Sequence, residues 1–361
     1  MRAEWLSFFL ALLGRVSPCI PSPRANRTES WSCSLSCAPS VSTLDPYRVK
    51  EVVRVKRRVG ASVKTLAVAR QWSEWRERVG GVRVVRLEAG CGRNSNRLAT
   101  LEDGSRACVR YGVDQDQVLG ETLCFHLAML LGIPNVPPLA LTKPDPSSQQ
   151  WSAVRDSIEA LRWSPDAIVS LTQWVPNATR VSIPAQLRKH MGAGVRPVSH
   201  VPWTSENMTS GDLSELMQWT DLILFDYLTA NFDRVANHLF NLQWDRRAMD
   251  RATNNLLRTT EGHLVFIDNE AGLVHGYRVL DRWEHFHKAL LNSTCVFRGL
   301  TVQRLMELKR SRSAAQCLRQ VYRAREPLAQ ELGFLSEAQL VTLQNRVDML
   351  CGHVQQCSTG T

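Results

Sequence analysis

Between Leu222 and Arg234 the chain reads Leu-Ile-Leu-Phe-Asp-Tyr-Leu-Thr-Ala-Asn-Phe-Asp-Arg, and this stretch decides the fold. Apolar residues recur at helical spacing from Leu213 to Leu228, and Thr209 or Ser210 can cap the start. The pattern therefore predicts a long helix with a buried face. A short polar turn follows the helix and ends in Asp233.

A second acid ends a short apolar run, which is typical of a buried strand. The run covers residues 263–267, and Asp268 follows it directly. Further upstream, residues 97–101 and 106–111 read as two strands joined by a turn, and residues 82–87 are also strand-like. A helix is predicted from about residue 119 to residue 131.

The order of these pieces carries more information than any one of them. A glycine-containing turn (Gly90, Gly92) comes first, then a strand with Arg110, a helix with Glu121, a long helix before Asp233, and a strand before Asp268. This order matches a phosphoryl-transfer site of the protein-kinase type. Taken alone, each piece has an ordinary structural explanation, such as a capping turn or a surface ion pair.

Longer motifs resemble a known family, the four-jointed box proteins, which are related to the Golgi kinases of the secretory pathway. The resemblance rests on residues 222–234 and 266–277, with Gly120-Glu-Thr-Leu and residues 133–139 in agreement, and covers residues 82–357. It implies an α+β, two-lobed, protein-kinase-like fold. We expect a small strand-rich lobe at residues 82–142 and a larger, mostly helical lobe at residues 143–357.

The resemblance also implies a function and roles for single residues. The implied activity is transfer of the ATP γ-phosphate, with Mn²⁺ or Mg²⁺, to Ser or Thr in the cadherin repeats of extracellular proteins of the Fat and Dachsous type, which regulate growth and planar polarity. Asp233 would be the catalytic base and Asp268 the metal-binding acid. Glu121 would pair with the strand cation that binds the nucleotide, and Gly90 and Gly92 would cover its phosphates.

Two positions depart from the family pattern. Arg110 stands where a lysine is expected, and the two residues are not interchangeable because guanidinium is planar and larger. His238 stands five residues after Asp233, where a metal-binding asparagine or acid is expected. Imidazole suits Mn²⁺ better than Mg²⁺, which prefers oxygen ligands.

The N-terminal region carries signals of the secretory pathway. Residues 5–13 form an apolar run after Arg2, so segment 1–16 reads as a signal peptide or short anchor, or alternatively as a buried helix. Nine residues are too few to span a bilayer, which needs about 20. The chain has four N-glycosylation triplets, which start at Asn26, Asn177, Asn207 and Asn292. These signals favour the Golgi lumen, with or without an anchor, or the extracellular space.

The ten cysteines include no C-x-x-C pair, which argues against a zinc site and favours disulfides in a secreted chain. We expect Cys295 to bond within the C-terminal half, to Cys351 or to Cys357.

The net charge of +10 is concentrated in one segment. Residues 48–86 contain twelve Lys or Arg against three Glu, and all but two of these cations lie within a predicted linker and basic stalk at residues 17–80. In a secreted context this basic arm reads as a solvated stalk or as a contact for polyanions, and not as a nucleic-acid site.

Two functions remain open from the sequence. The first is a secretory-pathway serine/threonine kinase. The second is a secreted, growth-regulating signalling protein that uses a degraded, inactive kinase fold for binding.

Overall fold

The computed structural model describes residues 74–185, 187–188 and 209–359. The expectations for segment 1–16, for most of the basic arm and for Asn26 and Asn207 lie outside these residues.

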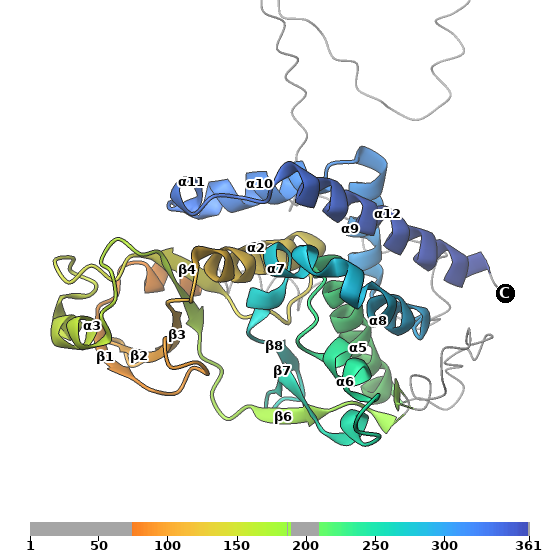
Figure 1. The fold of residues 1–361 in the computed structure, drawn as a ribbon, viewed down its shortest axis with the longest axis horizontal. Helices are drawn as coiled ribbons and strands as arrows, with labels where there is room; N and C mark the ends of the chain where they lie inside the picture. The colour runs from red at the N-terminus through yellow and green to blue at the C-terminus, as the bar shows by residue number, and fades with distance from the viewer. Residues whose placement is uncertain (1–73, 186, 189–208, 360–361) are drawn as a thin grey trace, which may run out of the picture. The chain divides into compact units, whose positions relative to one another are not determined.

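The first sheet has five strands, which Figure 1 places at the small end of the described fold. Its spatial order is β1-β2-β3-β5-β4, and all neighbours pair antiparallel. The strands are β1 (Val84–Glu88), β2 (Arg97–Leu101), β3 (Arg106–Arg110), β4 (Leu139–Thr142) and β5 (Val169–Gln173). Since β5 lies between β3 and β4, the expected lobe boundary at residue 142 is too early, and the sheet needs residues through Gln173.

The core beneath this sheet uses segments that the sequence placed outside it. A helical turn at residues 74–79 and the segment around α3 (Arg155–Leu161) both pack against the strands. Their fully or nearly buried side chains are Trp75, Val79, Trp151, Val154, Ile158 and Trp163. Residues 74–80 are therefore part of the folded body and not of the linker.

Part of the basic arm is also used internally. Arg76 forms an ion pair with the buried carboxylate of Glu326 at 2.6 Å, and Glu326 also contacts the His126 ring at 3.0 Å. Arg78 and Arg83 pair with Asp103 and Glu102 in the turn after β2. These arginines are therefore engaged by carboxylates of the same chain.

A second, three-stranded antiparallel sheet and the helices form the larger part of the fold (Figure 1). The strands are β6 (Thr179–Ser182), β7 (Ala252–Arg258) and β8 (Leu264–Phe266). The remaining helices are α2 (Gln115–Leu131), α5 (Ser210–Thr229), α6 (Val235–Asn241), α7 (Val274–Arg278), α8 (Leu280–Asn292), α9 (Gly299–Ser311), α10 (Ala314–Arg325), α11 (Ala329–Leu332) and α12 (Glu337–Thr359).

Helix α5 forms where the opening stretch predicts it. Thr209 is its N-cap, and the Thr209 and Asp212 side chains form a reciprocal capping box. Its second half is buried on all sides, and Ala230 ends it in the left-handed conformation (φ 53°). The buried helix therefore holds the polar turn at residues 231–234 in a fixed position.

Helix α2 packs against the segment after β8 with almost no side chain between them. A Cβ on Gly120 would lie 2.9 Å from the carbonyl oxygen of Glu270, and one on Gly272 would lie 2.5 Å from the sulfur of Cys124 on α2. Gly276 is equally confined against the backbone of Ala230. Glycine is required at these positions because a Cβ would collide with backbone at Gly120 and Gly276 and with the Cys124 sulfur at Gly272.

The structure contains two disulfides between described residues, Cys91–Cys108 and Cys295–Cys357. The Cys295–Cys357 bond confirms that Cys295 pairs within the C-terminal half, whereas Cys351, the alternative partner, is a buried free thiol. Cys351 and Cys357 both lie on α12, and six residues at 100° each turn the two side chains toward different faces. Burial raises the pKa of the Cys351 thiol to about 11.

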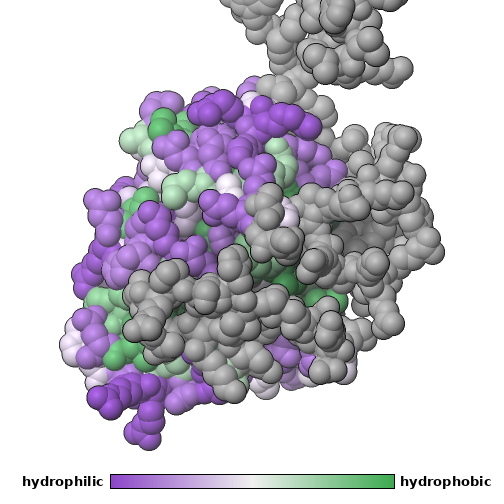
Figure 2. Space-filling view, turned by 90° about the vertical axis from the view of Figure 1, so that its right-hand side faces the viewer, coloured by the Kyte–Doolittle hydropathy of each residue, from purple (hydrophilic) through white to green (hydrophobic). Residues whose placement is uncertain are grey.

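The described surface is mostly hydrophilic on the face shown in Figure 2, and its hydrophobic residues form small separate patches. In the part of the chain that the structure describes, every helix is too short or too polar to cross a lipid bilayer.

The close packing at Gly276 gives a first prediction. Gly276→Ala should lower the free energy of unfolding by about 2 kcal/mol or more, because its methyl group collides with backbone that cannot yield. Gly352→Ala is the matched control, since this glycine lies in α12 with open space around it. The control should gain up to about 1 kcal/mol from helix propensity. Urea denaturation measures both, and equal stabilities would contradict the close approach.

Candidate active site

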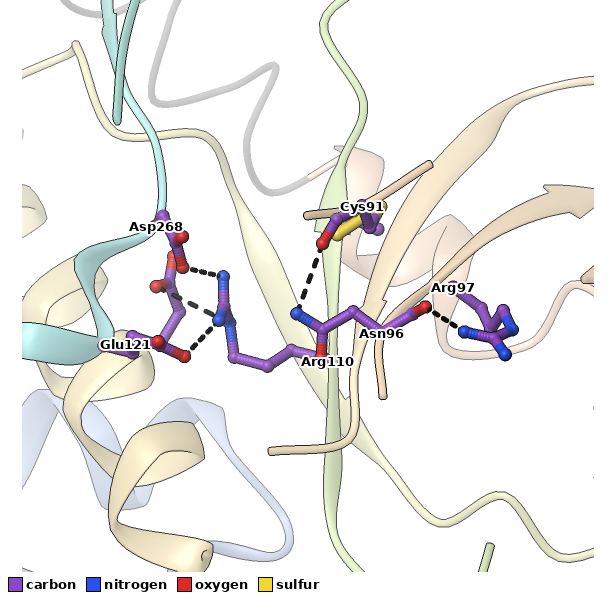
Figure 3. Close-up of a disulfide and its surroundings, with 8 residues drawn as sticks. Cys91, Asn96, Arg97, Arg110, Glu121 and Asp268 are labelled. Atoms are coloured by element: carbon purple, nitrogen blue, oxygen red, sulfur yellow. Dashed lines mark hydrogen bonds and ion pairs between the residues drawn. A yellow bond between two sulfur atoms is a disulfide. The ribbon is translucent and has the colours of Figure 1, made fainter. Parts of the chain in front are cut away.

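The guanidinium of Arg110 lies where three carboxylates meet. It comes from the end of β3 and forms ion pairs with Glu121 of α2 and with Asp268 and Glu270, which follow β8. Figure 3 shows Arg110 extending from its strand to lie between Glu121 and Asp268. The Arg110 side chain is only 7% exposed, so these ion pairs are largely shielded from water. The strand cation, the helix acid and the strand-end acid therefore share one site, as the order of the motifs predicts.

Burial and charge act in opposite directions on these groups. Burial raises the pKa of Glu121 and of Glu270, and the positive charge of Arg110 opposes that rise. Burial alone would lower the pKa of Arg110, but the three carboxylates outweigh this effect and raise it. Arg110 is therefore the positive charge that allows three acids to stand together, two of them, Glu121 and Glu270, buried.

Asp268 owes its position to an unusual backbone conformation. It follows β8, adopts left-handed angles (φ 57°, ψ 57°) and precedes a short 3₁₀ turn, Asn269–Ala271. Aspartate is one of the few residues other than glycine that tolerates this conformation. Asp268 also keeps a partly exposed carboxylate, at 31%, whereas Glu121 is almost fully buried.

A second buried arginine, Arg234, braces the turn that carries Asp233. Its guanidinium pairs with Asp226 of α5 and donates to the side-chain oxygen of Asn269. It also donates to the backbone oxygens of Asn255 and Ile267, each at 3.1 Å. The side chain has no solvent exposure. Arg234 therefore holds α5, β7 and the end of β8 in one arrangement.

Asp233 lies in the same electrostatic environment as Asp268. Its carboxylate accepts a hydrogen bond from Asn255 Nδ2 at 2.8 Å, and its backbone N–H donates to Asn231 Oδ1 at 3.0 Å. Burial raises the pKa of Asp233, and the negative charge of Asp268 raises it further. The adjacent Arg234 opposes both effects. Two carboxylates that interact electrostatically in this way can contact the same bound group.

The glycine turn lies beside these acids. Gly90 and Gly92 are exposed and have positive φ angles of 146° and 79°, and Cys91 between them is bonded to Cys108 of β3. Arg93, the next residue, forms an ion pair with Glu270 at 2.7 Å. The turn is therefore anchored to the strand that carries Arg110.

His238 is the one proposed metal ligand that the structure does not bring to the acids. It lies in α6, and its Nδ1 contacts the carbonyl oxygen of Ala248 at 2.6 Å. Since a carbonyl can only accept, Nδ1 carries the proton in this contact. In the described ranges, the single group of three metal-binding side chains with closely spaced ligand atoms is Cys295, His353 and Cys357. The two cysteine sulfurs of this group are joined in a disulfide, so the group offers no thiolate ligand.

The acids around Arg110 suit a hard divalent cation. Within the described part of the chain, Glu121 Oε2 and Asp268 Oδ1 are buried oxygens whose partner is the Arg110 guanidinium. Carboxylate oxygens are ligands that Mg²⁺ and Mn²⁺ both accept. Asp268, with its partial exposure, is the residue best placed to hold such an ion.

Several residues of the site carry no local sequence signal. Glu270, Arg234, Arg93 and Asn255 act through partners far away along the chain. Glu270 and Arg234 lie next to Asp268 and Asp233, so adjacency to the predicted acids was the one available clue.

The buried charge cluster gives a second prediction. Arg110→Met should lower the free energy of unfolding at pH 7 by about 3 kcal/mol or more, because it leaves Glu121 and Asp268 without their counter-charge and Glu270 with Arg93 alone. Arg106→Met, on the same strand, removes an exposed arginine paired with Glu88 and should cost less than about 1 kcal/mol.

The pH dependence of the Arg110 variant is a further check on the same prediction. Without Arg110 the pKa values of Glu121 and Glu270 rise further, so the folded state binds protons that the unfolded state does not. The variant should therefore regain stability as the pH falls from 8 to 5, relative to wild type. Urea denaturation across this range tests it, and parallel stability curves for the two proteins would contradict it.

Comparisons with known proteins identify the family. The Four-jointed box protein middle domain matches residues 70–360. Four-jointed box protein 1 of Xiphophorus maculatus is 56% identical over 283 residues, which cover 78% of this chain and 65% of the relative. The human protein of that name is 49% identical over 289 residues, with 80% and 66% covered. The Drosophila melanogaster relative, named extracellular serine/threonine protein kinase four-jointed, is 36% identical over 321 residues, with 76% and 55% covered.

Solved structures agree on the fold. The Golgi casein kinase with Mn/ADP bound superposes with a TM-score of 0.52 at 12% identity, covering 80% of this chain and 76% of that structure. Hydra Fam20 with sugar superposes with a TM-score of 0.50 at 13% identity, covering 84% and 91%. The two-lobed, α+β kinase-like fold is thus confirmed. The chain spans roughly two thirds or less of the length of its curated relatives. It belongs to the four-jointed box protein family.

Proposed function

We propose that this chain is a secretory-pathway serine/threonine protein kinase that transfers phosphate from ATP to extracellular proteins. The observation that carries the proposal is the meeting of Arg110, Glu121 and Asp268, with Asp233 in the same electrostatic environment. These are the cation, the helix acid, the metal acid and the base of a phosphoryl-transfer site. The relative named extracellular serine/threonine protein kinase four-jointed supports the same reading.

Each residue has a distinct task in this proposal. Arg110 supplies positive charge toward the nucleotide phosphates, and Glu121 fixes its orientation. Asp233 orients the acceptor hydroxyl and takes its proton, which its raised pKa favours. Asn255 and Arg234 keep Asp233 in place through direct contacts. Little covalent chemistry is required of the protein, so positioning and charge account for the catalysis.

ATP and a divalent cation, Mn²⁺ or Mg²⁺, are the proposed cofactors. When bound, the cation neutralises the phosphate charge that develops during transfer. Asp268 would hold it. The Golgi casein kinase, which shares the fold, was crystallised with Mn/ADP bound. His238 is not needed for this role, since its described contact is with the backbone of Ala248.

The proposed acceptors are Ser and Thr residues in extracellular cadherin repeats of the Fat and Dachsous type, a proposal that rests on family membership. The proposed place of action is the Golgi lumen or the extracellular space. The disulfide Cys295–Cys357 fits an oxidising compartment, because cytosolic thiols are kept reduced. A contact between the basic arm and polyanions remains a proposal, and it concerns residues 48–73 because the later arginines are paired.

A third prediction separates the roles of the two aspartates. Asp268→Asn should weaken the binding of ATP with Mn²⁺ about tenfold or more and abolish phosphate transfer, because the cation loses its carboxylate. Asp233→Asn should reduce turnover about 100-fold or more while changing nucleotide affinity less than about threefold, because its role belongs to the chemical step. Calorimetry with ATP and Mn²⁺ measures affinity, and labelled ATP with a cadherin-repeat protein measures transfer.

Asp156→Asn is the control, since it neutralises an exposed carboxylate on α3 and should match wild type in both assays. If both site variants transfer phosphate at the wild-type rate, the roles are misassigned. If the wild-type protein binds no ATP and labels no acceptor, the fold serves binding without catalysis.

A fourth prediction concerns the compartment. Asn177 and Asn292 are both exposed, so the secreted protein should carry N-glycans at both positions. Asn177→Gln and Asn292→Gln should each make the protein migrate faster on a gel, by a shift that corresponds to the mass of one glycan. After enzymatic removal of glycans, the wild type and both variants should migrate alike. Unmodified wild-type protein recovered from the culture medium would contradict the prediction.

A further inference from the structure

The loop at residues 91–97 is held at both ends, although much of it is exposed. Cys91 is covalently bonded to Cys108 of β3. At the other end, the buried Asn96 side chain donates to the carbonyl oxygen of Cys91 at 3.3 Å (Figure 3). The Arg97 guanidinium also donates to the backbone oxygen of Asn96 at 2.7 Å. Residues in the middle of the loop are therefore presented from a fixed support.

Arg93 reaches from this loop to the acids of the site. Its Nη2 lies 2.7 Å from Glu270 Oε1. Glu270 bonds Arg110 through its other oxygen, so the two arginines share one carboxylate. Burial raises the pKa of Asp233, which lies on a different segment, and the positive charge of Arg93 is one of the effects that oppose this rise. Arg93 therefore lies near both acidic segments, 233 and 268–270.

The two arginines differ in how easily each can change partners. Arg110 is 7% exposed and has three carboxylate partners. Arg93 is 52% exposed, and Glu270 is its one ion-pair partner among the described residues. Because half of its side chain is already in water and one partner holds it, Arg93 can turn to another anion more readily than Arg110 can. Glu270, which is 8% exposed, would keep its contact with Arg110.

We propose that Arg93 is a phosphate-binding residue, which exchanges Glu270 for the phosphate chain of a nucleoside di- or triphosphate. The inference rests on the proposed function, because it requires a nucleotide at this site. Guanidinium suits the task, since its planar fork can donate two parallel hydrogen bonds to phosphate oxygens. Without nucleotide, the Glu270 pair keeps the side chain over the site. The adjacent glycine at position 92 leaves open space for the phosphates beside the backbone.

The test measures binding, independently of catalysis. Arg93→Ala should weaken ATP and ADP binding about 10- to 100-fold in calorimetry with Mn²⁺, because charge-assisted hydrogen bonds are lost. Adenosine, which has no phosphate, should bind both proteins equally. Arg93→Lys should fall between them, since it keeps the charge and loses the fork. Arg86→Ala removes an exposed arginine from β1 of the same sheet and should match wild type.

The outcomes separate this inference from the proposed function. If wild type binds ATP and Arg93→Ala binds it as well or better, Arg93 only braces Glu270 and the inference is wrong while the proposed function stands. If wild type binds no ATP, both are wrong. Equal weakening of adenosine and ATP would show a general distortion of the site and would also overturn the inference. Thermal unfolding of each variant verifies that the compared proteins are folded.

Discussion

The site depends on one buried guanidinium, that of Arg110. It is satisfied only if β3, α2 and the segment after β8 meet at the same point, because each contributes a charge to the cluster. The cluster continues through Asn269, which donates to Glu121 on one side and accepts from Arg234 on the other. Arg234 then reaches Asp226 of α5. One continuous polar network therefore connects the small sheet, both predicted acids and the central helix.

The ion pairs of Arg110 explain why arginine, and not the lysine expected from the family pattern, suits position 110. A lysine ammonium is a compact point charge, whereas guanidinium presents five donors in a rigid fork. Arg110 uses this fork to contact three carboxylates from two separate segments. The residue that departs from the family pattern therefore holds the segments of the site together, in addition to its proposed role as a cation for phosphates.

The sequence predicted those elements whose signals are local. The long helix with its Thr209 cap, the strand pair around residues 97–110 and the two aspartates all lie where periodicity and order placed them. It could not predict contacts made across long separations, such as Arg110 with Glu270 or β5 between β3 and β4. The sequence did not predict that Trp75 belongs to the hydrophobic core, because this residue lies within a strongly basic segment. Sequence spacing left open whether Cys351 or Cys357 bonds Cys295. The structure shows that Cys357 forms the bond, since the two cysteines lie on different faces of α12.

The glycine-mediated contact of α2 has a consequence for regulation. In protein kinases, activity is commonly controlled by moving the helix that carries the acid partner of the strand cation. Here Gly120 of that helix lies directly against the backbone of residues 270 and 272, and the Cys124 sulfur packs against Gly272, so little space is left for α2 to shift. Swinging α2 outward would also separate Arg110 from Glu121. Close packing of this kind resists movement of α2 once the chain has folded, so under the proposed function control would fall on synthesis, transport and encounter with the acceptor.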